Sequence, residues 1–372
     1  MVAKNKKKLG KLSISDMRKL INKKAGMNIA HNLNEDSPTI VKDWIPTGSR
    51  WLDSIICRGK LAGIPVGKVV EIAGLESTGK SYMAAQIAAN AQKKGMVVVI
   101  FDSESAIDPQ FLGRAGCNVE DLIYVQATSV ELVLETIEEL LGSGEQMLFV
   151  WDSLALTPAV SDVEGDFNPN SSMAVKARIL SKGMSKLTIA IANSQSTLLV
   201  LNQLKTNIPQ GPAARVQAMT TPYTTPGGKA MVYAYSLRIW LTGRKAKASF
   251  VTDERGYRIG SEVKVKLEKS RFGTQGRQCN FKILWGDEIG VQDEESWLDA
   301  IKSSEYFKQS GAWYELVYED GTSEKFQTAT WKEKLKNEKF KSRVYTLMDE
   351  EVIMKFDDRT GDSKNFYDEE EE

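Results

Sequence analysis

The amino-acid sequence predicts an α/β protein built on a mostly parallel, twisted sheet. Apolar runs of strand length recur at Val69–Ala73, Val97–Asp102, Met147–Asp152 and Leu198–Asn202. Helical stretches lie between these runs. Strands that are buried on both faces and alternate with helices form parallel sheets. The pattern therefore favours a sheet with helices on both faces.

Two of the intervening helices are marked by composition and capping residues. Tyr82–Lys94 is rich in alanine and ends before Gly95, as helices commonly do. Val130–Leu141 repeats apolar residues at helical spacing, and Thr128 with Glu131 forms a capping-box pair at its start. Both stretches are predicted to connect parallel strands.

Three later segments alternate apolar and polar residues, and they are predicted to extend the sheet as antiparallel strands. They are Tyr235–Leu241, Val263–Leu267 and Asn280–Trp285. From about Asp287 the chain is charged and is predicted to be helical, with aromatic residues available for a small core. These residues are Trp297, Tyr306, Phe307, Trp313 and Tyr314. We expect a small α/β region at this end of the chain.

Shifts in composition divide the chain into four predicted regions. They are a basic N-terminal arm at 1–45, a core at 46–286, a C-terminal domain at 287–355 and an acidic, disordered tail at 356–372. The arm is too small to fold alone.

The arm contains two predicted elements. Ile14–Ile21 has helical spacing, with Ser15 as its N-cap. Met27–Leu33 alternates weakly and is predicted to form one strand. A lone strand needs a partner, either its own core or another chain.

The charge of the chain is balanced, but its distribution is uneven. Lys and Arg number 49, as do Asp and Glu, so the formal net charge is zero. Lysines crowd residues 4–11, and Asp368–Glu372 is wholly acidic. Such tails meet charged partners or are solvated segments that serve solubility, and the sequence leaves both interpretations open.

The cysteine and histidine content excludes some classes of site. Cys57, Cys117 and Cys279 are few and scattered, which argues against a disulfide framework and fits a reducing compartment. His31 is the only histidine, so a multi-histidine metal site is excluded. The sequence shows neither an apolar signal peptide nor an apolar run of about 20 residues, so we expect a cytosolic protein without a membrane span.

Residues Gly74–Ser81 read GLESTGKS and match the phosphate-binding pattern G-x-x-x-x-G-K-[ST]. A predicted strand precedes this phosphate loop and a predicted helix follows it, as the chemistry requires. Lys80 is expected to reach the β and γ phosphates of ATP, and Ser81 to offer its hydroxyl to Mg²⁺. The predicted ATP-binding residues here are Gly74, Leu75, Glu76, Ser77, Thr78, Gly79, Lys80, Ser81 and Tyr82.

Acidic and amide side chains end the other strands of the predicted sheet. Asp152 is expected to hold Mg²⁺, and Glu104, two residues after Asp102, is the candidate general base for the attacking water. The alternative is that these acids cap following helices. Gln203 is a candidate sensor of the γ-phosphate, or else a plain amide at a strand end.

These motifs, in this order, resemble the RecA-type recombinases, and within them those of large tailed phages of the T-even kind. The resemblance runs from about residue 45 to 290. It is carried by the segments PTGSRWLD, GLESTGKS, FDSESAIDPQFL, VWDSLALTP, LVLNQLK, TTPGGKAMVYAYSLRI and VKLEKSRFGTQG. It implies a RecA-like P-loop ATPase core.

The resemblance also implies roles for individual residues. Glu104 matches the family's catalytic glutamate, and Gln203 matches the glutamine that couples ATP to DNA. Lys269 and Arg271 match positions that reach the ATP of the neighbouring protomer. The implied adenine contacts are Asp108 and Phe111, and the implied protomer-interface residues are Met27, Ile29 and Tyr233.

Two loops, Ser161–Ser172 and Lys205–Pro226, match the family's DNA-binding loops. Both follow predicted strands and are long and polar, and long loops in compact domains are usually functional. The predicted DNA-binding residues are Lys205, Asn207, Arg215, Tyr223, Gly227, Gly228 and Lys229. Cations can neutralise phosphates and a tyrosine can stack on bases. The alternative is that these are solvated loop side chains.

The leading hypothesis is a DNA-dependent ATPase that forms a helical filament on single-stranded DNA and exchanges strands with duplex DNA. ATP would be hydrolysed to ADP and phosphate with Mg²⁺. Expected partners are further copies of the chain, a single-stranded-DNA-binding protein and a recombination mediator, in the bacterial host cytoplasm if the chain is phage-encoded. Alternatives are a hexameric helicase-like ATPase, a small-molecule P-loop kinase and a non-enzymatic DNA-coating protein.

Overall fold

The computed structural model describes residues 12–26, 29–33, 35, 39–164, 172–207, 222–243, 249–273, 275–285 and 289–354. The chain divides into two compact units, Met1–Lys42 and Asp43–Glu372. Among the described residues, no helix is both long enough and apolar enough to span a membrane. Cys57, Cys117 and Cys279 are free thiols, and all three are buried.

The N-terminal unit contains one helix, α1 (Ile14–Ala25), within its described part. Its N-cap is Ser13, whose hydroxyl accepts the Asp16 N–H, so the prediction of Ser15 as the cap is wrong. The predicted strand at Met27–Leu33 is also wrong over the described residues 29–33. The side-chain oxygen of Asn22 accepts the N–H groups of Ile29 and Ala30, which a strand partner would otherwise take. Met27 lies outside the described residues.

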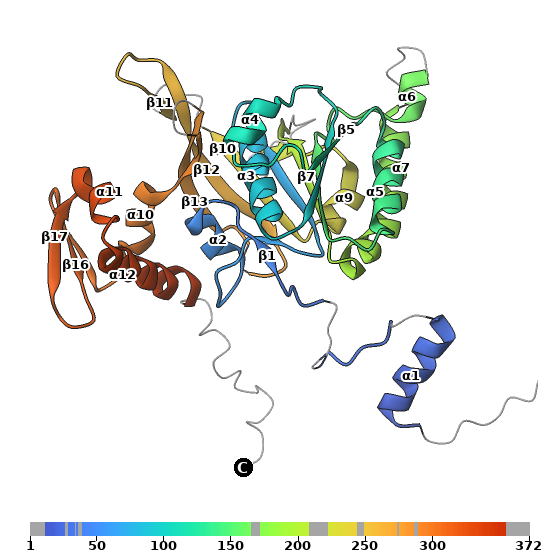
Figure 1. Cartoon of the computed structure of the whole chain (residues 1–372), viewed down its shortest axis with the longest axis horizontal. Coiled ribbons are helices and arrows are strands. Elements are labelled where there is room, and N and C mark those ends of the chain that lie inside the picture. The colour runs from blue at the N-terminus through green and yellow to red at the C-terminus, as the bar shows by residue number, and fades with distance from the viewer. Residues whose placement is uncertain are drawn as a thin grey trace, which may run out of the picture. The chain divides into compact units, whose positions relative to one another are not determined.

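A ten-stranded sheet forms the centre of the second unit, within the described residues (Figure 1). The order across it is β14-β13-β12-β10-β3-β7-β6-β4-β5, with β11 paired to β12. Its strands are β3 (Val69–Gly74), β4 (Val97–Asp102), β5 (Leu122–Gln126), β6 (Met147–Asp152), β7 (Thr197–Gln203), β10 (Leu237–Gly243), β11 (Phe250–Thr252), β12 (Arg258–Ser270), β13 (Gln278–Trp285) and β14 (Ile289–Gln292). The predicted α/β fold with a mostly parallel sheet is confirmed.

The directions of the later strands differ in part from the prediction. Strand β10 pairs parallel with β3, with Leu237 opposite Val70, so its predicted antiparallel orientation is wrong. Strands β12 and β13 are antiparallel, as predicted. Strand β5 was not predicted; it lies at the sheet edge and is mostly exposed, so it lacks the apolar run of a buried strand.

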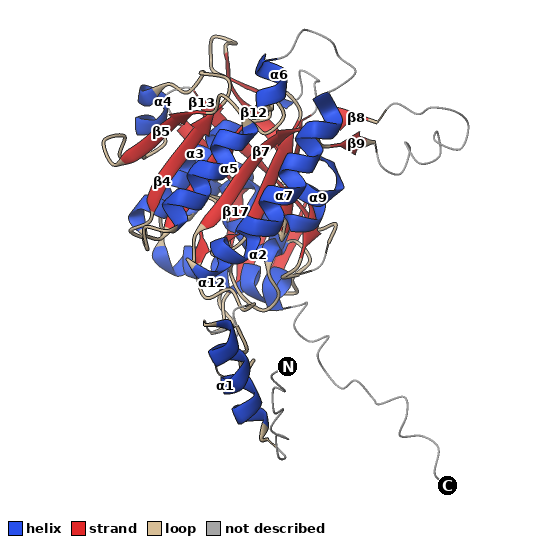
Figure 2. Cartoon of the chain, turned by 90° about the vertical axis from the view of Figure 1, so that its right-hand side faces the viewer, coloured by secondary structure: helices blue, strands red, loops and turns tan. Residues whose placement is uncertain are grey.

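Helices cover both faces of the sheet (Figure 2). One apolar core includes residues of α2 (Arg50–Ile56), α3 (Lys80–Lys93) and α4 (Pro109–Arg114). The other includes residues of α5 (Val130–Leu141), α7 (Ser172–Asn193) and α9 (Gly228–Ala234). Short pairs and turns complete the unit: β1 (Trp44–Ile45), β2 (Ile64–Pro65), α6 (Val160–Glu164), β8 (Lys205–Thr206) and β9 (Tyr223–Thr224).

The start of α5 differs from the predicted capping box. Ser129 is the N-cap, and its hydroxyl accepts the Leu132 N–H. The Glu131 carboxylate instead accepts the N–H of Val160. Thr128 and Ser129 are adjacent capping residues, and only the backbone geometry distinguishes them.

The C-terminal region contains strands as well as helices, so it is the small α/β region that we expected, although the chain after Asp287 is not helical throughout. Its elements are α10 (Trp297–Ile301), β15 (Phe307–Ser310), β16 (Trp313–Val317), β17 (Ser323–Gln327), α11 (Trp331–Lys334) and α12 (Glu338–Met348). The three strands form an antiparallel sheet. Phe307 and Trp297 are buried, as predicted, whereas Tyr306 and Trp313 are 40% and 52% exposed.

A buried polar cluster fixes the start of α2. The Asp53 carboxylate accepts the Thr47 hydroxyl at 2.7 Å. Asp293, from the segment after β14, accepts the Ser49 hydroxyl at 2.8 Å and the Trp51 N–H at 3.0 Å. Burial raises the pKa of Asp53 to about 8, against the hydrogen bonds from Thr47, and the nearby Asp293 adds to the rise. Asp53 is therefore protonated in the folded protein at neutral pH.

This raised pKa predicts a pH-dependent stability. The folded state holds a proton on Asp53 that the unfolded state loses above pH 3.8, so the free energy of unfolding falls as pH rises from about 4 to about 8. Asp53→Asn removes this contribution. The stability of the variant relative to wild type should rise with pH by up to about 1.4 kcal/mol per unit. Urea unfolding at several pH values measures the difference, and parallel pH profiles would contradict it.

Candidate nucleotide-binding and catalytic site

The phosphate loop connects the end of β3 to the start of α3. Gly79 has φ +83°, and a Cβ atom there would lie 2.5 Å from Ile283 Cδ1. A Cβ on Gly74 would lie 2.4 Å from the Thr78 hydroxyl oxygen, which donates to Leu75 O at 2.8 Å. The loop is thus tightly folded at both glycines, and it ends at the N-terminus of a 14-residue helix. Such an N-terminus favours bound phosphate.

Lys80 lies over the phosphate loop and faces several carboxylates. Its ammonium group donates to the carbonyl oxygens of Leu75 at 3.0 Å and Gly74 at 3.4 Å. Burial lowers the pKa of Lys80, while Asp152, Glu104 and, in smaller part, Glu76 raise it. The structure therefore brings the predicted catalytic lysine together with the two predicted catalytic and metal-binding acids.

Ser81 and Asp152 lie side by side, as a magnesium site needs. The Ser81 hydroxyl donates to Asp152 Oδ2 at 2.9 Å. Burial raises the pKa of Asp152 to about 6, and the neighbouring Glu104 and Asp102 push it the same way. Mg²⁺ is usually held by one or two protein oxygens with phosphate oxygens and water. These two oxygens fit that role.

Asp102 organises the loop that carries Glu104. Its carboxylate accepts four successive backbone N–H groups, from residues 104 to 107, at 2.8–3.1 Å. It also accepts the Tyr124 hydroxyl of β5 at 3.1 Å. Asp102 thus fixes the backbone of this loop but caps no helix, since the N-cap of the following helix is Asp108. Tyr124 was not recognised in the sequence.

Glu104 lies beside the end of β6. Its Oε1 accepts the Ser153 hydroxyl at 3.3 Å. The Ser103 hydroxyl donates to Ser153 O at 3.1 Å and accepts the Ser153 N–H at 3.0 Å, which ties the ends of β4 and β6 together. The Glu104 carboxylate therefore faces the same space as Lys80 and Asp152. A carboxylate there is suited to take a proton from water near a γ-phosphate.

Aromatic side chains gather on the outer side of α3. The rings of Tyr82 and Phe111 are 4.5 Å apart at 75°, and Tyr82 and Trp285 are 6.4 Å apart. Asp108 is the N-cap of α4, and its Oδ1 accepts the Gln110 N–H at 2.9 Å. Trp285 was missed in the sequence, although an aromatic residue at a strand end is the signal that marks it. Flat apolar rings here suit a nucleotide base.

Gln203 lies between the phosphate loop and the second predicted DNA-binding loop. In the parallel pairing of β3 and β7 it lies opposite Gly74, and the next N–H, of Leu204, donates to Gly74 O at 3.0 Å. Lys205 then begins β8, which pairs with β9. The chain therefore continues directly from Gln203, which lies beside the phosphate loop, into the second predicted DNA-binding loop.

A hollow of about 550 Å³ lies between the ends of the two predicted DNA-binding loops. Asp162 and Lys176 line it from the first loop and α7, and Lys205, Gly227 and Gly228 line it from the second. The first predicted loop, Ser161–Ser172, begins within helix α6, and Ser172 is the first residue of α7. Residues 165–171 and 208–221, which include Arg215, lie outside the described part of the chain.

The remaining predicted DNA-binding residues lie near this hollow. Tyr223 is partly buried on β9, and the Asn207 N–H donates to Pro222 O at 2.8 Å, which closes the pair of short strands. Lys229 is exposed in the first turn of α9. Cationic and aromatic side chains are thus present around the base of the loop.

Lys269 and Arg271 lie far from the phosphate loop of the same chain. Lys269 pairs with Arg238, and Arg238 pairs with Glu71, which lies three residues before Gly74 on β3. Along the strand direction, Lys269 is therefore about 10 Å from the start of the phosphate loop. Lys269 Nζ donates to Val232 O at 2.7 Å, and Arg271 donates to Tyr233 O at 2.9 Å. The ring of Tyr233 is 69% exposed beside them. Burial, together with the nearby Arg271 and Arg238, lowers the pKa of Lys269 to about 8.

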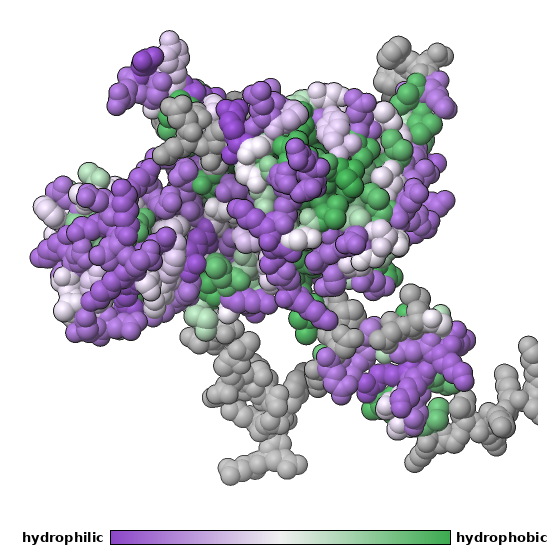
Figure 3. All heavy atoms as spheres, viewed as in Figure 1, coloured by the Kyte–Doolittle hydropathy of each residue, from purple (hydrophilic) through white to green (hydrophobic). Residues whose placement is uncertain are grey.

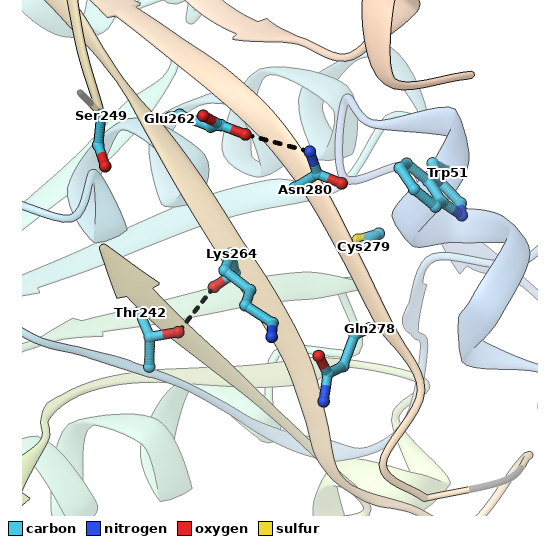
Figure 4. A pocket seen from close by; sticks show the side chains of 8 residues that line it. All are labelled: Trp51, Thr242, Ser249, Glu262, Lys264, Gln278, Cys279 and Asn280. Atoms are coloured by element: carbon cyan, nitrogen blue, oxygen red, sulfur yellow. Dashed lines mark hydrogen bonds between the residues drawn. The ribbon is translucent and has the colours of Figure 1, made fainter. Parts of the chain in front are cut away.

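A second hollow, of about 350 Å³, lies over β10, β12 and β13 (Figure 4). Its polar groups bond to one another: Asn280 donates to Glu262 at 3.2 Å, and the Thr242 hydroxyl donates to Lys264 O at 3.2 Å. None of the residues predicted for the nucleotide or DNA site lines it.

Known proteins resemble this chain over most of its length. The family described as the RecA N-terminal domain matches residues 12–290. Protein RecA of Colwellia psychrerythraea is 33% identical over 279 residues, covering 75% of this chain and 76% of that protein. Protein RecA of Chloroflexus aurantiacus is 33% identical over 296 residues, covering 80% and 79%. A crystal structure of the RadB recombinase has a TM-score of 0.47 at 20% identity, covering 66% of this chain and 98% of that one.

The position of Glu104 predicts a separation of nucleotide binding from hydrolysis. Glu104→Gln keeps the shape and the hydrogen bond from Ser153 but removes the base. ATP turnover should fall by about 10²–10⁴, while ATP binding persists. Glu76→Gln is the control. It also removes a carboxylate that raises the pKa of Lys80, but Glu76 belongs to the phosphate loop and is not the proposed base. Wild-type turnover in a folded Glu104→Gln protein would exclude Glu104 as the base.

Proposed function

The chain belongs to the RecA family, and we propose that it is an ATP-dependent recombinase that forms a helical filament on single-stranded DNA. In this proposal the filament pairs that strand with homologous duplex DNA and exchanges strands. The observation that carries the proposal is the continuous path from the phosphate loop through Gln203 into the Lys205–Pro226 loop. Nucleotide and DNA would thus act on neighbouring backbone.

The proposed ATPase reaction uses the groups gathered at the ends of β3, β4 and β6. Lys80 and the backbone of the phosphate loop would hold the β and γ phosphates, and Ser81 with Asp152 would hold Mg²⁺. Glu104 would take the proton of the water that attacks the γ-phosphorus as the bond to the β-phosphate oxygen breaks. The products are ADP and phosphate. The Gln203 amide would sense the γ-phosphate by hydrogen bonding.

DNA would bind at the hollow between the two loops. Lys176 and Lys205 line it, and Lys229 is exposed on the adjoining helix. A local group of cations can displace counterions from DNA even when the whole chain has no net charge. The base-stacking role of Tyr223 and the phosphate-binding role of Arg215 remain part of the proposal.

Self-assembly would use surfaces that a single chain leaves open. The edge strand β5 exposes Ile123 and Tyr124 by 41% and 44%. Figure 3 shows an apolar area on the face of the molecule where Figure 1 labels β5. Separately, α1 exposes an apolar stripe formed by Ile14, Met17, Leu20 and Ile21. We propose that the arm of one copy, including Ile29 and Met27, covers the β5 edge of the next copy. A head-to-tail contact of this kind generates a helix.

The same assembly would give Lys269, Arg271 and Tyr233 their role. They are too far along the sheet to serve the phosphate loop of their own chain, so they would act on the ATP of a neighbour. Affinity to phage recombinases, the partner proteins that load the filament and a cytoplasmic location belong to the proposal as well.

A hexameric helicase-like ATPase is the second candidate, because a closed ring would also place Lys269 and Arg271 against a neighbouring site. Negative-stain microscopy with single-stranded DNA and a non-hydrolysable ATP analogue separates the two. Open helices support the recombinase, closed rings support the helicase, and dispersed monomers contradict both. Lys80→Ala is the control, since it should prevent nucleotide-dependent assembly.

The exposed edge of β5 predicts a variant that cannot assemble. Ile123→Lys places a charge on the edge strand, and charged edge residues oppose strand addition. The variant should bind ATP as a monomer and form no filaments in sedimentation with DNA and the analogue. Ile189→Lys, at a position 67% exposed on α7, is the matched control and should assemble normally. Filaments of the Ile123→Lys protein would remove β5 from the assembly model.

A further inference from the structure

A buried ion pair lies inside the sheet, on neighbouring parallel strands. Arg238 Nε donates to Glu71 Oε2 at 2.6 Å, and the two side chains are 9% and 0% exposed. Asn202, fully buried on β7, donates from Nδ2 to Glu71 Oε1 at 3.0 Å. The strands β7, β3 and β10 are therefore joined through one carboxylate.

The same side chains hold the end of the Lys205–Pro226 loop. Arg238 Nη2 donates to the Thr225 hydroxyl at 2.9 Å, and Asn202 Nδ2 donates to Pro226 O at 2.9 Å. The Asn202 oxygen accepts the N–H of Gln203 at 3.0 Å. Thus Thr225 and Pro226, at the end of the loop, are linked to the buried Glu71 carboxylate through Arg238 and Asn202.

The strand that carries Glu71 leads directly into the phosphate loop. Glu71 lies three residues before Gly74 on β3, and Gly74 is paired with Gln203 on β7. A movement of Gln203 toward or away from a γ-phosphate would therefore displace Asn202. The side-chain amide of Asn202 also donates to Pro226 O, so the displacement would reach the end of the loop. Packing and hydrogen bonds of this kind carry coupling between sites.

Energetics favour a specific role for this pair over a purely stabilising one. Removing two charges from water is costly, and well-packed apolar residues are often at least as stabilising in such positions. The guanidinium group also has a defined shape, with separate N–H groups directed at Glu71 and at Thr225. Such a fork fixes the relative position of two segments.

We propose that Glu71, Asn202, Arg238 and Thr225 form a coupling network that transmits the nucleotide state of the phosphate loop to the DNA-binding loop. The inference rests on the proposed function, because it assumes that ATP and DNA bind at these two places. The residues are positioning residues: Glu71, Asn202 and Arg238 are buried, and Thr225 lines the hollow at the end of the loop. Coupling between two ligands is reciprocal and is measured by the change in affinity that one causes for the other.

The test compares DNA affinity with and without nucleotide. The dissociation constant for a fluorescent oligo-dT is measured in the presence and absence of a non-hydrolysable ATP analogue, and the ratio of the two is the coupling factor. Thr225→Val keeps the shape of the side chain and removes the acceptor for Arg238. It should reduce the coupling factor about tenfold. A variant that lost only a direct DNA contact would have higher dissociation constants both with and without the analogue, and their ratio would be unchanged.

Matched variants protect the test from unfolding and from unrelated effects. Thr242→Val removes a hydroxyl hydrogen bond elsewhere on β10 and should keep the wild-type coupling factor. Arg238→Lys keeps the charge beside Glu71 but loses the fork, and it should lower the factor as Thr225→Val does. The double variant should be no worse than either single one, because both break the same link. Thermal melting confirms that each variant is folded.

The outcomes separate this inference from the proposed function. A wild-type protein whose DNA affinity does not respond to the analogue would overturn both. A wild-type response that persists in Thr225→Val, or additive losses in the double variant, would overturn the coupling network alone. Loss of the response in both network variants, with Thr242→Val unaffected, supports it.

Discussion

The parallel alignment of β3, β4, β6 and β7 is the constraint on which the rest of the site depends. Their carboxyl ends meet at one edge, which brings together Lys80, Glu104, Asp152 and Gln203 although they are far apart in the sequence. Local bonds then set the details, most clearly the four backbone N–H groups that the Asp102 carboxylate accepts. Without the parallel pairing these groups would have no common place to act.

The proposed assembly depends on residues at the opposite end of the sheet. Strand β12 runs antiparallel to β10 and places Lys269 and Arg271 at the end away from the phosphate loop, beside the exposed Tyr233. A single chain therefore presents the proposed phosphate-binding groups at one end and Lys269 and Arg271 at the other. Repetition of one head-to-tail contact would combine the two ends in every site.

The sequence predicted what is local and missed what depends on pairing. The phosphate loop and the buried strands were recognisable because apolar runs and glycines act over a few residues. The parallel direction of β10 was not, since it depends on pairing with distant β3. Arg238 lies inside an apolar strand, and its partner Glu71 is 167 positions away, so no local signal joins them. The cap at Ser129 was missed because the adjacent Thr128 is also a capping residue and has Glu131 three positions after it.

The central claim, that each ATP site is completed by a second copy of the chain, is tested most directly by mixing two inactive variants. Glu104→Gln lacks the proposed base but keeps nucleotide binding, and Arg271→Ala lacks the cation proposed to act on a neighbour. In an equal mixture on single-stranded DNA, one adjacent pair in four combines an intact Glu104 with an intact Arg271. The account predicts recovery of about one quarter of wild-type ATP turnover. A mixture no more active than its separate components would contradict it.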